Sequence, residues 1–253
     1  MFQIFPQTDS NLVIDPIDLY LSDARPVIRS KPWILINMVN SIDGSISFDG
    51  RAGGLSGPSD KRVYQIIRSL ADIILVGAGT IRAESYRAPR TPERNIAEIR
   101  KLRGQDQRPR LAVVSGQLNL DPKIGMFSES LNEDKPPIIY TTKNASQKRK
   151  DSLSSYAEII EFENETISIE EILADLSKRN TKIVVCEGGP NLNSHLLAAG
   201  VIDEYCLTIS PCTVGGNDPT TLIEQVVDKP TKLHLDRIMM EDDFLFCRYL
   251  TQK

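Results

Sequence analysis

The amino-acid sequence predicts an α/β fold whose central sheet is mixed, mainly parallel, and ends in antiparallel strands. Over most of the 253 residues, short apolar runs alternate with amphipathic helical segments, which is the pattern of βαβ units. The end of the chain differs, because the strand-like runs 205–209, 233–240 and 244–250 have no helical segment between them. Successive strands without a crossover helix favour antiparallel pairing.

The parallel part of the sheet is predicted from six short apolar runs. They are 33–39, 72–76, 111–114, 138–141, 157–162 and 182–186. Helices are predicted where apolar residues recur three and four positions apart. Three helical segments are 11–23, 91–108, which is a surface helix and loop, and 191–199. A fourth is capped by Ser59 and has Val63, Ile66, Ile67 and Leu70 on one face. A fifth is opened by Ser168 and has Ile169, Ile172, Leu173 and Leu176 on one face.

The bulk composition is that of an ordinary globular protein, with 40% apolar and 25% charged residues. A net charge of −4 with both signs interspersed argues against a nucleic-acid-binding protein. No run reaches the roughly 18 apolar residues of a membrane span, and the first six residues lack the basic start of a signal peptide. We therefore expect a cytoplasmic protein, with residues 1–31 as an N-terminal extension and residues 32–253 as a single domain.

The cysteines and histidines give no sign of a metal site. None of the four cysteines forms a C-x-x-C pair, and three lie in apolar runs, so we expect buried free thiols. His195 and His234 are the only histidines, which makes a structural zinc site improbable. The sequence also lacks the P-loop motif, the G-x-S-x-G nucleophile elbow and the zinc-deaminase signature.

A glycine-rich turn follows the apolar run 72–76. Gly77 and Gly79 let the backbone turn sharply there, and the N–H groups at the start of a following helix favour an anion such as a pyrophosphate. Arg82 stands where the dinucleotide fingerprint has its third glycine, so the motif is incomplete. A plain strand-to-helix turn explains the segment as well as a ligand site does.

A second turn, at 187–193, follows another predicted parallel strand. Gly188 and Gly189 leave room for a flat or phosphorylated ligand, and Pro190 suits the first turn of a helix. Glu187 stands where the strand ends, at the usual ligand edge of an α/β sheet. The alternative is a glutamate that caps an amide or pairs with an arginine. A third turn, at 213–218, lies between antiparallel strands and favours a structural loop.

The loop after the first predicted strand is also rich in glycine. Residues 41–58 would cost folding entropy, and such a loop is usually functional or disordered. Basic residues stand near it, and as a set they could hold a sugar phosphate, although any one of them could simply face solvent. They are Arg51, Lys61, Arg62, Arg68, Arg82, Arg87 and Arg90.

Together these segments resemble one family, the riboflavin-pathway pyrimidine reductases. Members form the C-terminal half of the bacterial bifunctional deaminase–reductase and also occur as stand-alone reductases. The matching segments are 37–44, 68–84, 186–192 and 201–204, in the family's order, and the resemblance covers roughly residues 33–250. The ordered set is specific, whereas each segment alone is weak.

The resemblance implies a dihydrofolate-reductase-like three-layer fold, NADPH as the hydride donor and, commonly, a homodimer. It also implies reduction of the ribosyl group of a phosphoribosylaminopyrimidine, of the 5-amino-6-(5-phosphoribosylamino)uracil type, to a ribityl group. Carried over, the cofactor-binding residues are Gly77, Gly79, Thr80, Glu84, Ser115, Gly188, Gly189, Pro190, Asn191 and Leu192.

On the substrate side, the resemblance implies Arg68 for the phosphate and Glu187 near the reacting carbon, and we add Arg62 as a substrate contact. Our candidates for proton transfer or polar support are Glu187, Asp43 and, third, Asp60. No acid ends the strand before Ser115, where an acid would repel the 2′-phosphate of NADPH.

Two departures from the family concern the substrate side. Many members have a tryptophan over the nicotinamide, where residues 52–56 contain no aromatic, and many have Asp-Asp-Pro, where residues 84–86 are Glu-Ser-Tyr. A dihydrofolate or pterin reductase of the same fold is therefore an alternative. A protein that binds NADPH without turnover is another.

Overall fold

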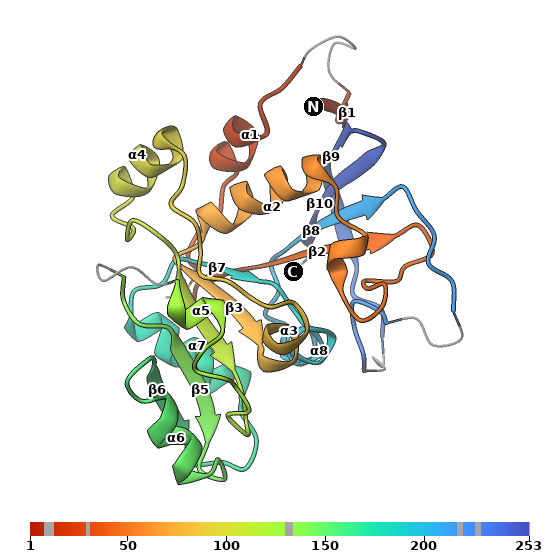
Figure 1. The fold of residues 1–253 in the computed structure, drawn as a ribbon. Coiled ribbons are helices and arrows are strands. Elements are labelled where there is room, and N and C mark those ends of the chain that lie inside the picture. Colours follow the sequence, from red (N-terminus) through yellow and green to blue (C-terminus); the bar gives the residue numbers. More distant parts are fainter. Residues whose placement is uncertain (8–12, 29–30, 130–133, 217–219, 226–228, 253) are drawn as a thin grey trace.

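The computed structural model describes residues 1–253 except 8–12, 29–30, 130–133, 217–219, 226–228 and 253. Its described residues form a ten-stranded sheet in the order β1-β9-β10-β8-β2-β7-β3-β4-β5-β6 (Figure 1). The strands are β1 (Phe2–Phe5), β2 (Trp33–Ser41), β3 (Ile73–Gly77), β4 (Arg110–Val114), β5 (Ile138–Thr142), β6 (Glu158–Phe162), β7 (Ile183–Cys186), β8 (Glu204–Ser210), β9 (Leu233–Glu241) and β10 (Phe244–Thr251).

Helices cover both faces of the sheet (Figure 1). They are α1 (Pro16–Ser22), α2 (Pro58–Leu70), α3 (Ala78–Ala83), α4 (Arg94–Leu102), α5 (Gly125–Ser128), α6 (Gln147–Leu153), α7 (Ile169–Lys178), α8 (Pro190–Ala198) and the short 3₁₀ helix η1 (Ala52–Gly54). Every helix in the described part of the chain is too short or too polar to span a bilayer.

The mixed sheet that the sequence predicts is confirmed. From β8 through β2, β7, β3, β4 and β5 to β6, each strand runs parallel to its neighbour. β10 pairs antiparallel with β8 and β9, and β1 pairs antiparallel with β9. The parallel strands therefore end at one edge of the sheet, where α/β proteins bind ligands.

Two hydrophobic cores, one on each face, follow from the alternation of side chains along the strands. In β3, Ile74 and Val76 join the core that α2 covers, whereas Ile73 and Leu75 join the core that α7 and α8 cover. The four apolar residues predicted for one face of α2 are all buried in the first core. Both faces of the parallel strands are covered, which explains why their sequences read as unbroken apolar runs.

The start of α2 differs from its prediction. Gly57 is the N-cap and Pro58 is the first helical residue, so Ser59 lies buried inside the first turn and does not cap the helix. Proline is favoured at this position because its missing N–H would have no helical partner. By contrast, Ser168 caps α7 as predicted, since its side chain accepts from the N–H groups of Glu170 and Glu171.

The first 31 residues contribute to the same layered structure. β1 extends the sheet beyond β9, and α1 packs on α2. The Asp15 side chain accepts from the Ile17 N–H and so starts α1. The prediction of a helix at 11–23 is confirmed for 16–22, while residues 11 and 12 lie outside the described residues. All four cysteines are free, and three are buried, as predicted.

A buried network of charges fastens this N-terminal segment to the last strands. The Arg25 guanidinium donates to both carboxylate oxygens of Glu204, at 2.8 and 2.9 Å, and Arg248 Nε donates to Glu204 at 2.8 Å. The Arg237 nitrogens donate to Asp23 at 2.9 and 2.8 Å. The Glu204 side chain is 0% exposed. Such a carboxylate is stable only because its charge is paired and its oxygens are hydrogen-bonded.

This network makes the stability depend on Glu204 and on pH. Burial alone would raise the pKa of Glu204, but Arg25 and Arg248 outweigh it and lower that pKa to about 2. The folded pKa lies below the unfolded one, so this stabilisation is complete above about pH 4.5 and is lost as the pH falls towards 2. We predict that Glu204→Gln lowers the free energy of unfolding by about 3–5 kcal/mol at pH 7.

Urea unfolding of both proteins at pH 7 and at pH 3.5 measures this prediction. The difference between the wild type and Glu204→Gln should shrink at the lower pH, because the Glu204 carboxyl group takes up a proton in the unfolded chain while it stays charged in the folded protein. An equal difference at both pH values would show that the substitution acts through packing rather than through the charge.

Candidate functional site

A pocket of about 1770 Å³ opens at the carboxyl ends of the parallel strands. Its lining extends from residues 37–39 at the end of β2, along α2, to residues 114–119 beyond β4 and residues 189–192 beyond β7. Single-ligand pockets measure about 300–1,000 Å³. The volume therefore suits two ligands side by side. We call the part of the pocket that α2 lines the α2 half, and the part lined by the residues at and beyond the end of β4 the β4 half.

The two glycine-rich turns meet in the middle of this pocket. They follow the paired strands β3 and β7, and the Gly77 N–H donates to the Gly188 carbonyl at 2.7 Å. A side chain on Gly189 would place its Cβ 2.9 Å from Thr80 Oγ1, and one on Gly77 would place its Cβ 3.4 Å from the Gly189 nitrogen. A Cβ at Gly189 would therefore displace the Thr80 hydroxyl, whereas one at Gly77 would only reach van der Waals contact with the second turn.

The residues predicted for the cofactor are brought together with one exception. Gly188 does not line the pocket, because its carbonyl contacts Gly77 and its φ of +78° turns the chain beside Met38. Glu84 lines the pocket and accepts a hydrogen bond from the Ala52 N–H at 2.7 Å, which connects α3 to η1. The others line one continuous wall: Gly77, Gly79, Thr80, Ser115, Gly189, Pro190, Asn191 and Leu192.

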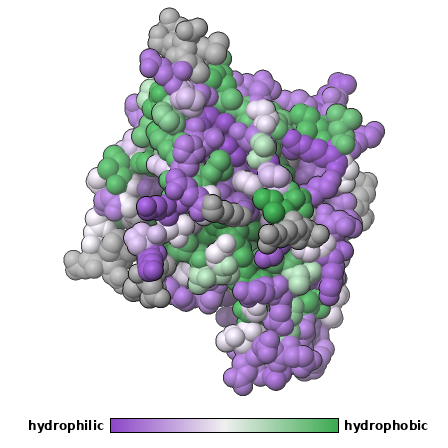
Figure 2. Space-filling model, turned by 180° about the vertical axis from the view of Figure 1, so that it is seen from behind, coloured by the Kyte–Doolittle hydropathy of each residue, from purple (hydrophilic) through white to green (hydrophobic). Residues whose placement is uncertain are grey.

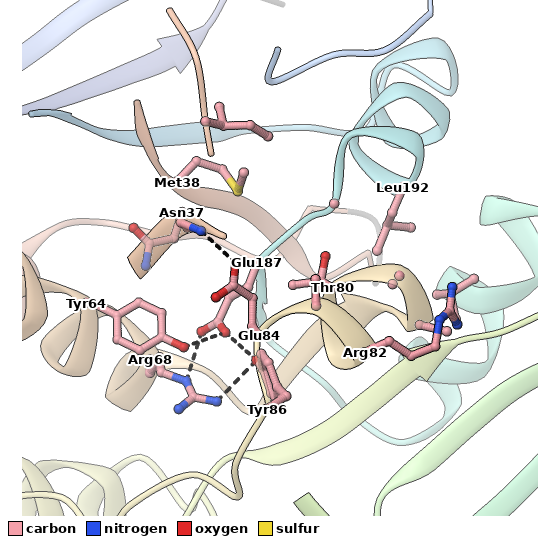
Figure 3. A pocket seen from close by; sticks show the side chains of 18 of the residues that line it. Asn37, Met38, Tyr64, Arg68, Thr80, Arg82, Glu84, Tyr86, Glu187 and Leu192 are labelled. Carbon is pink, nitrogen blue, oxygen red and sulfur yellow. Dashed lines mark hydrogen bonds and ion pairs between the residues drawn. The ribbon is translucent and has the colours of Figure 1, made fainter. Parts of the chain in front are cut away.

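In the α2 half of the pocket, four side chains form one polar cluster (Figure 3). Arg68 Nε lies 2.9 Å from Glu187 Oε1, in an ion pair whose N–H does not point at the oxygen. The Tyr64 hydroxyl donates to Glu187 Oε2 at 2.9 Å, and the Tyr86 hydroxyl donates to the same oxygen. We call these four residues the Glu187 cluster. Sequence reasoning placed Arg68 and Glu187 near the substrate and offered pairing of Glu187 with an arginine as an alternative, and the structure shows that this arginine is Arg68.

Burial and charge determine the protonation of the two tyrosines and the arginine of the cluster. Burial, and next the negative charge of Glu187, raises the pKa of Tyr86 and of Tyr64 well above the ordinary value, so both phenols remain donors at neutral pH. Burial alone would lower the pKa of Arg68, but Glu187 and the phenols outweigh it and the pKa lies above its ordinary value. Arg68 is therefore a permanent cation.

Two other candidates lie elsewhere. Asp43 is exposed, does not line the pocket, and accepts from Ser41 Oγ and from the N–H groups of Val214 and Gly215. These hydrogen bonds, of which that from Ser41 is the strongest, lower the pKa of Asp43 to about 2. Arg62 lies at the rim of the pocket, exposed and 3.2 Å from Asp15.

Asp60 is the second buried carboxyl group in the α2 half. It lies in the first turn of α2, 7% exposed, and accepts from Ser56 Oγ at 2.5 Å. Both residues line the pocket. Among the described residues, no group of three or more His, Cys, Asp or Glu side chains could hold a metal ion.

Sequence reasoning missed the two tyrosines. Tyr64 lies four residues before Arg68, hence on the same face of α2, and this spacing could have indicated it. Tyr86 belongs to the departure from the family at residues 84–86, but its contact with Glu187 had no signal, because Tyr86 lies in the irregular chain after α3 and meets Glu187 only through the fold.

The contact between the turns gives a testable prediction. Gly189→Ala should lower the free energy of unfolding of the ligand-free protein by about 1–3 kcal/mol, because its Cβ overpacks against Thr80 Oγ1. Gly79→Ala is the matched control: nothing lies within 4 Å of its Cβ, so stability should be unchanged or higher by up to about 1 kcal/mol.

Thermal and urea unfolding measure both variants. The double variant Gly189→Ala/Thr80→Ala should recover part of the loss, because the clashing oxygen is gone. Additive effects of the two substitutions would contradict the contact.

Comparison with known proteins identifies the family of this chain. The family model described as "RibD C-terminal domain" matches residues 32–242. A protein from Archaeoglobus fulgidus named 2,5-diamino-6-ribosylamino-4(3H)-pyrimidinone 5′-phosphate reductase is 26% identical over 195 residues, 77% of this chain and 87% of that protein. The protein of the same name from Methanothermobacter thermautotrophicus is 26% identical over 77% of this chain and 84% of its own length.

The riboflavin biosynthesis protein RibD of Mycobacterium tuberculosis is also 26% identical, but this chain spans only 46% of that protein. Among solved structures, a pyrimidine reductase-like protein from Corynebacterium diphtheriae superposes with a TM-score of 0.79 at 26% identity, over 94% of this chain and 99% of that one. The family predicted from the ordered motifs is thereby confirmed: the chain belongs to the RibD C-terminal domain family.

Proposed function

We propose that this chain is an NADPH-dependent reductase of riboflavin biosynthesis that acts on a phosphoribosylaminopyrimidine and reduces its ribosyl group to ribityl. The observation that carries the proposal is the pair of interlocked glycine turns in a pocket with room for a cofactor and a substrate. The curated relatives named as pyrimidinone 5′-phosphate reductases support the same reaction.

The middle and the β4 half of the pocket suit NADPH. The free N–H groups at the start of α8 favour a pyrophosphate between the two glycine turns. Gly79 offers open space, since nothing lies within 4 Å of a Cβ built there. NADPH, when bound, supplies the hydride, while Thr80, Glu84 and Leu192 orient it against the substrate.

Selection of NADPH over NADH would depend on two arginines that lie beside the loop after β4. The Arg82 side chain donates to the Asn119 carbonyl at 3.3 Å, and that of Arg149 donates to the Gln117 carbonyl at 2.8 Å. Both thus border the loop that begins at Ser115, and within the described residues neither forms an ion pair with a carboxylate. A 2′-phosphate at this loop would neutralise both charges.

The α2 half suits the sugar phosphate and the pyrimidine. Lys61 and Arg90 line it as exposed cations that have no carboxylate partner within the described chain. We assign the phosphate to these two residues together with Arg68, and give Arg62 a lesser role because it pairs with Asp15 at the rim.

The proposed reaction begins with opening of the sugar ring. The bond from the first carbon to the ring oxygen breaks, the ring oxygen takes a proton, and the carbon–nitrogen bond becomes an iminium. Glu187 stabilises the positive charge on this nitrogen. We assign to the carboxyl group of Asp60 the transfer of a proton to the ring oxygen. Bound NADPH would supply a hydride to the first carbon, which would yield the ribitylamino product and NADP⁺.

The direct test is whether the purified protein oxidises NADPH with the pathway pyrimidine, in its 2-amino or its deaminated form, measured as loss of NADPH absorbance. Turnover with dihydrofolate alone would replace the proposal by a pterin reductase, for which the aromatic rings of Tyr64 and Tyr86 in the pocket are an argument. NADPH binding without turnover of any of these substrates would leave a nucleotide-binding protein.

Glu187→Gln should lower kcat by roughly 100-fold, because the developing positive charge loses its counter-ion. NADPH affinity, measured by fluorescence quenching, should change much less, since the Glu187 side chain points into the α2 half (Figure 3). Unchanged turnover would remove Glu187 from the mechanism.

The double variant Arg82→Ala/Arg149→Ala should raise the KM for NADPH by about 10- to 100-fold and leave that for NADH unchanged, since charged hydrogen bonds contribute about 1.5–3 kcal/mol. Arg94→Ala is the control for loss of surface charge, because Arg94 is exposed and paired only with Glu98 on α4. Equal effects on both cofactors would place the 2′-phosphate elsewhere.

We also propose a homodimer. Phe2 and Ile4 of the edge strand β1 are 42% and 45% exposed, and Met240, the β9 partner of Phe2, is 38% exposed. Apolar side chains on an edge strand favour pairing with a second copy. Figure 2 shows that apolar surface also gathers on the back of the molecule. Sedimentation analysis of the purified chain measures the oligomeric state.

A further inference from the structure

Two tyrosines enclose the only buried arginine of the pocket. The Cζ of Arg68 lies 5.0 Å from the centre of the Tyr64 ring and 5.3 Å from that of the Tyr86 ring. Figure 3 shows both phenols and the guanidinium converging on Glu187. Aromatic rings at this distance attract a cation, and two such rings restrict the movement of the guanidinium.

The hydrogen bonds in the cluster run in one direction. Arg68 Nη2 donates to the Tyr86 hydroxyl at 3.2 Å, and that hydroxyl donates to Glu187 Oε2. Tyr86 therefore occupies one terminal nitrogen of Arg68 and one oxygen of Glu187 at the same time. Within the described residues, the other terminal nitrogen of Arg68, Nη1, has no hydrogen-bond partner.

The glutamate is equally constrained. Its Oε2 accepts from both phenols, and its Oε1 faces the guanidinium. Two phenols donate to the glutamate and the charge of Arg68 lies beside it, so this side chain is placed to accept hydrogen bonds and to stabilise positive charge.

We infer that Tyr86, supported by Tyr64, is a positioning residue that clamps Arg68 to Glu187 and thereby leaves Nη1 as the one terminal nitrogen of Arg68 that has no hydrogen bond within the described residues and is available to the substrate. This inference rests on the proposed function and deepens it. The phosphate then receives a single contact from Arg68, and Lys61 and Arg90 supply the remaining charge. Glu187 acts only as an anion.

The clamp also connects α2 to the glycine turn that follows β7. Tyr64 and Arg68 belong to α2, whereas Glu187 directly follows β7 and precedes the turn that contacts Gly77. Tyr86 connects them from the chain after α3. The clamp therefore sets where the substrate lies relative to the cofactor turn, and a small displacement there lowers the reaction rate.

Tyr86→Phe tests the clamp, because it keeps the ring and removes the hydroxyl. We expect the KM for the pyrimidine to rise about ten-fold or more and kcat to fall, while the Kd for NADPH stays within about two-fold. Tyr64→Phe removes one donor to Glu187 but keeps the Arg68–Tyr86 hydrogen bond, so its effect should be smaller. Tyr86→Ala, which also removes the ring, should be worse than Tyr86→Phe.

Tyr156→Phe is the matched control, since Tyr156 is 47% exposed and packs against Phe127 outside the pocket. It should behave as the wild type. Unchanged kinetics in Tyr86→Phe, or losses shared equally by NADPH and substrate, would overturn the inference.

A binding measurement separates this inference from the proposed function. Ribose 5-phosphate is titrated into the wild type and Tyr86→Phe by calorimetry with NADP⁺ present. If the wild type turns over no pyrimidine, the proposed function fails, but about ten-fold weaker sugar phosphate binding in Tyr86→Phe still supports the clamp. Equal binding to both proteins, or none to the wild type, overturns it.

Discussion

The site depends on the contact between two backbone turns at the ends of β3 and β7. The Gly77 N–H reaches the Gly188 carbonyl at 2.7 Å, and no side chain fits between Gly189 and Thr80. Because the two strands pair in parallel, their turns open on the same edge of the sheet. This approach creates the floor on which a dinucleotide can lie, and it places Glu187 beside that floor.

Two buried carboxylates have the same kind of partner, an arginine, but different roles in the protein. Glu204 and Glu187 are each paired with arginine in a nearly dry environment. Glu204 lies away from the pocket, and its arginines fasten the N-terminal segment to β8 and β10. Glu187 lies inside the pocket, where a ligand can reach the terminal nitrogen of Arg68 that neither Glu187 nor Tyr86 occupies. Pairing is required for burial in both cases, and only the position decides the role.

Much of the fold could be predicted, because strand and helix periodicity depend on neighbouring residues. The parallel orientation of the first strands and the antiparallel end followed from helix placement, whereas the order of the strands in the sheet did not. The start of α2 was predicted wrongly, since Ser59 resembles a cap but Pro58 begins the helix and Gly57 caps it. A helix after the Gly77 turn was expected without bounds, and it is the short helix α3.

The sequence by itself determined the family, the two glycine turns and the residues that follow each strand, since these are properties of order along the chain. Only the tertiary structure decided which of the predicted residues meet. It joined Arg68 to Glu187, introduced Tyr64 and Tyr86 between them, and left Asp43 out of the pocket lining. The physical reason is that these partners are separated by up to 123 positions and are brought together by strand pairing. Local patterns carry no information about such contacts.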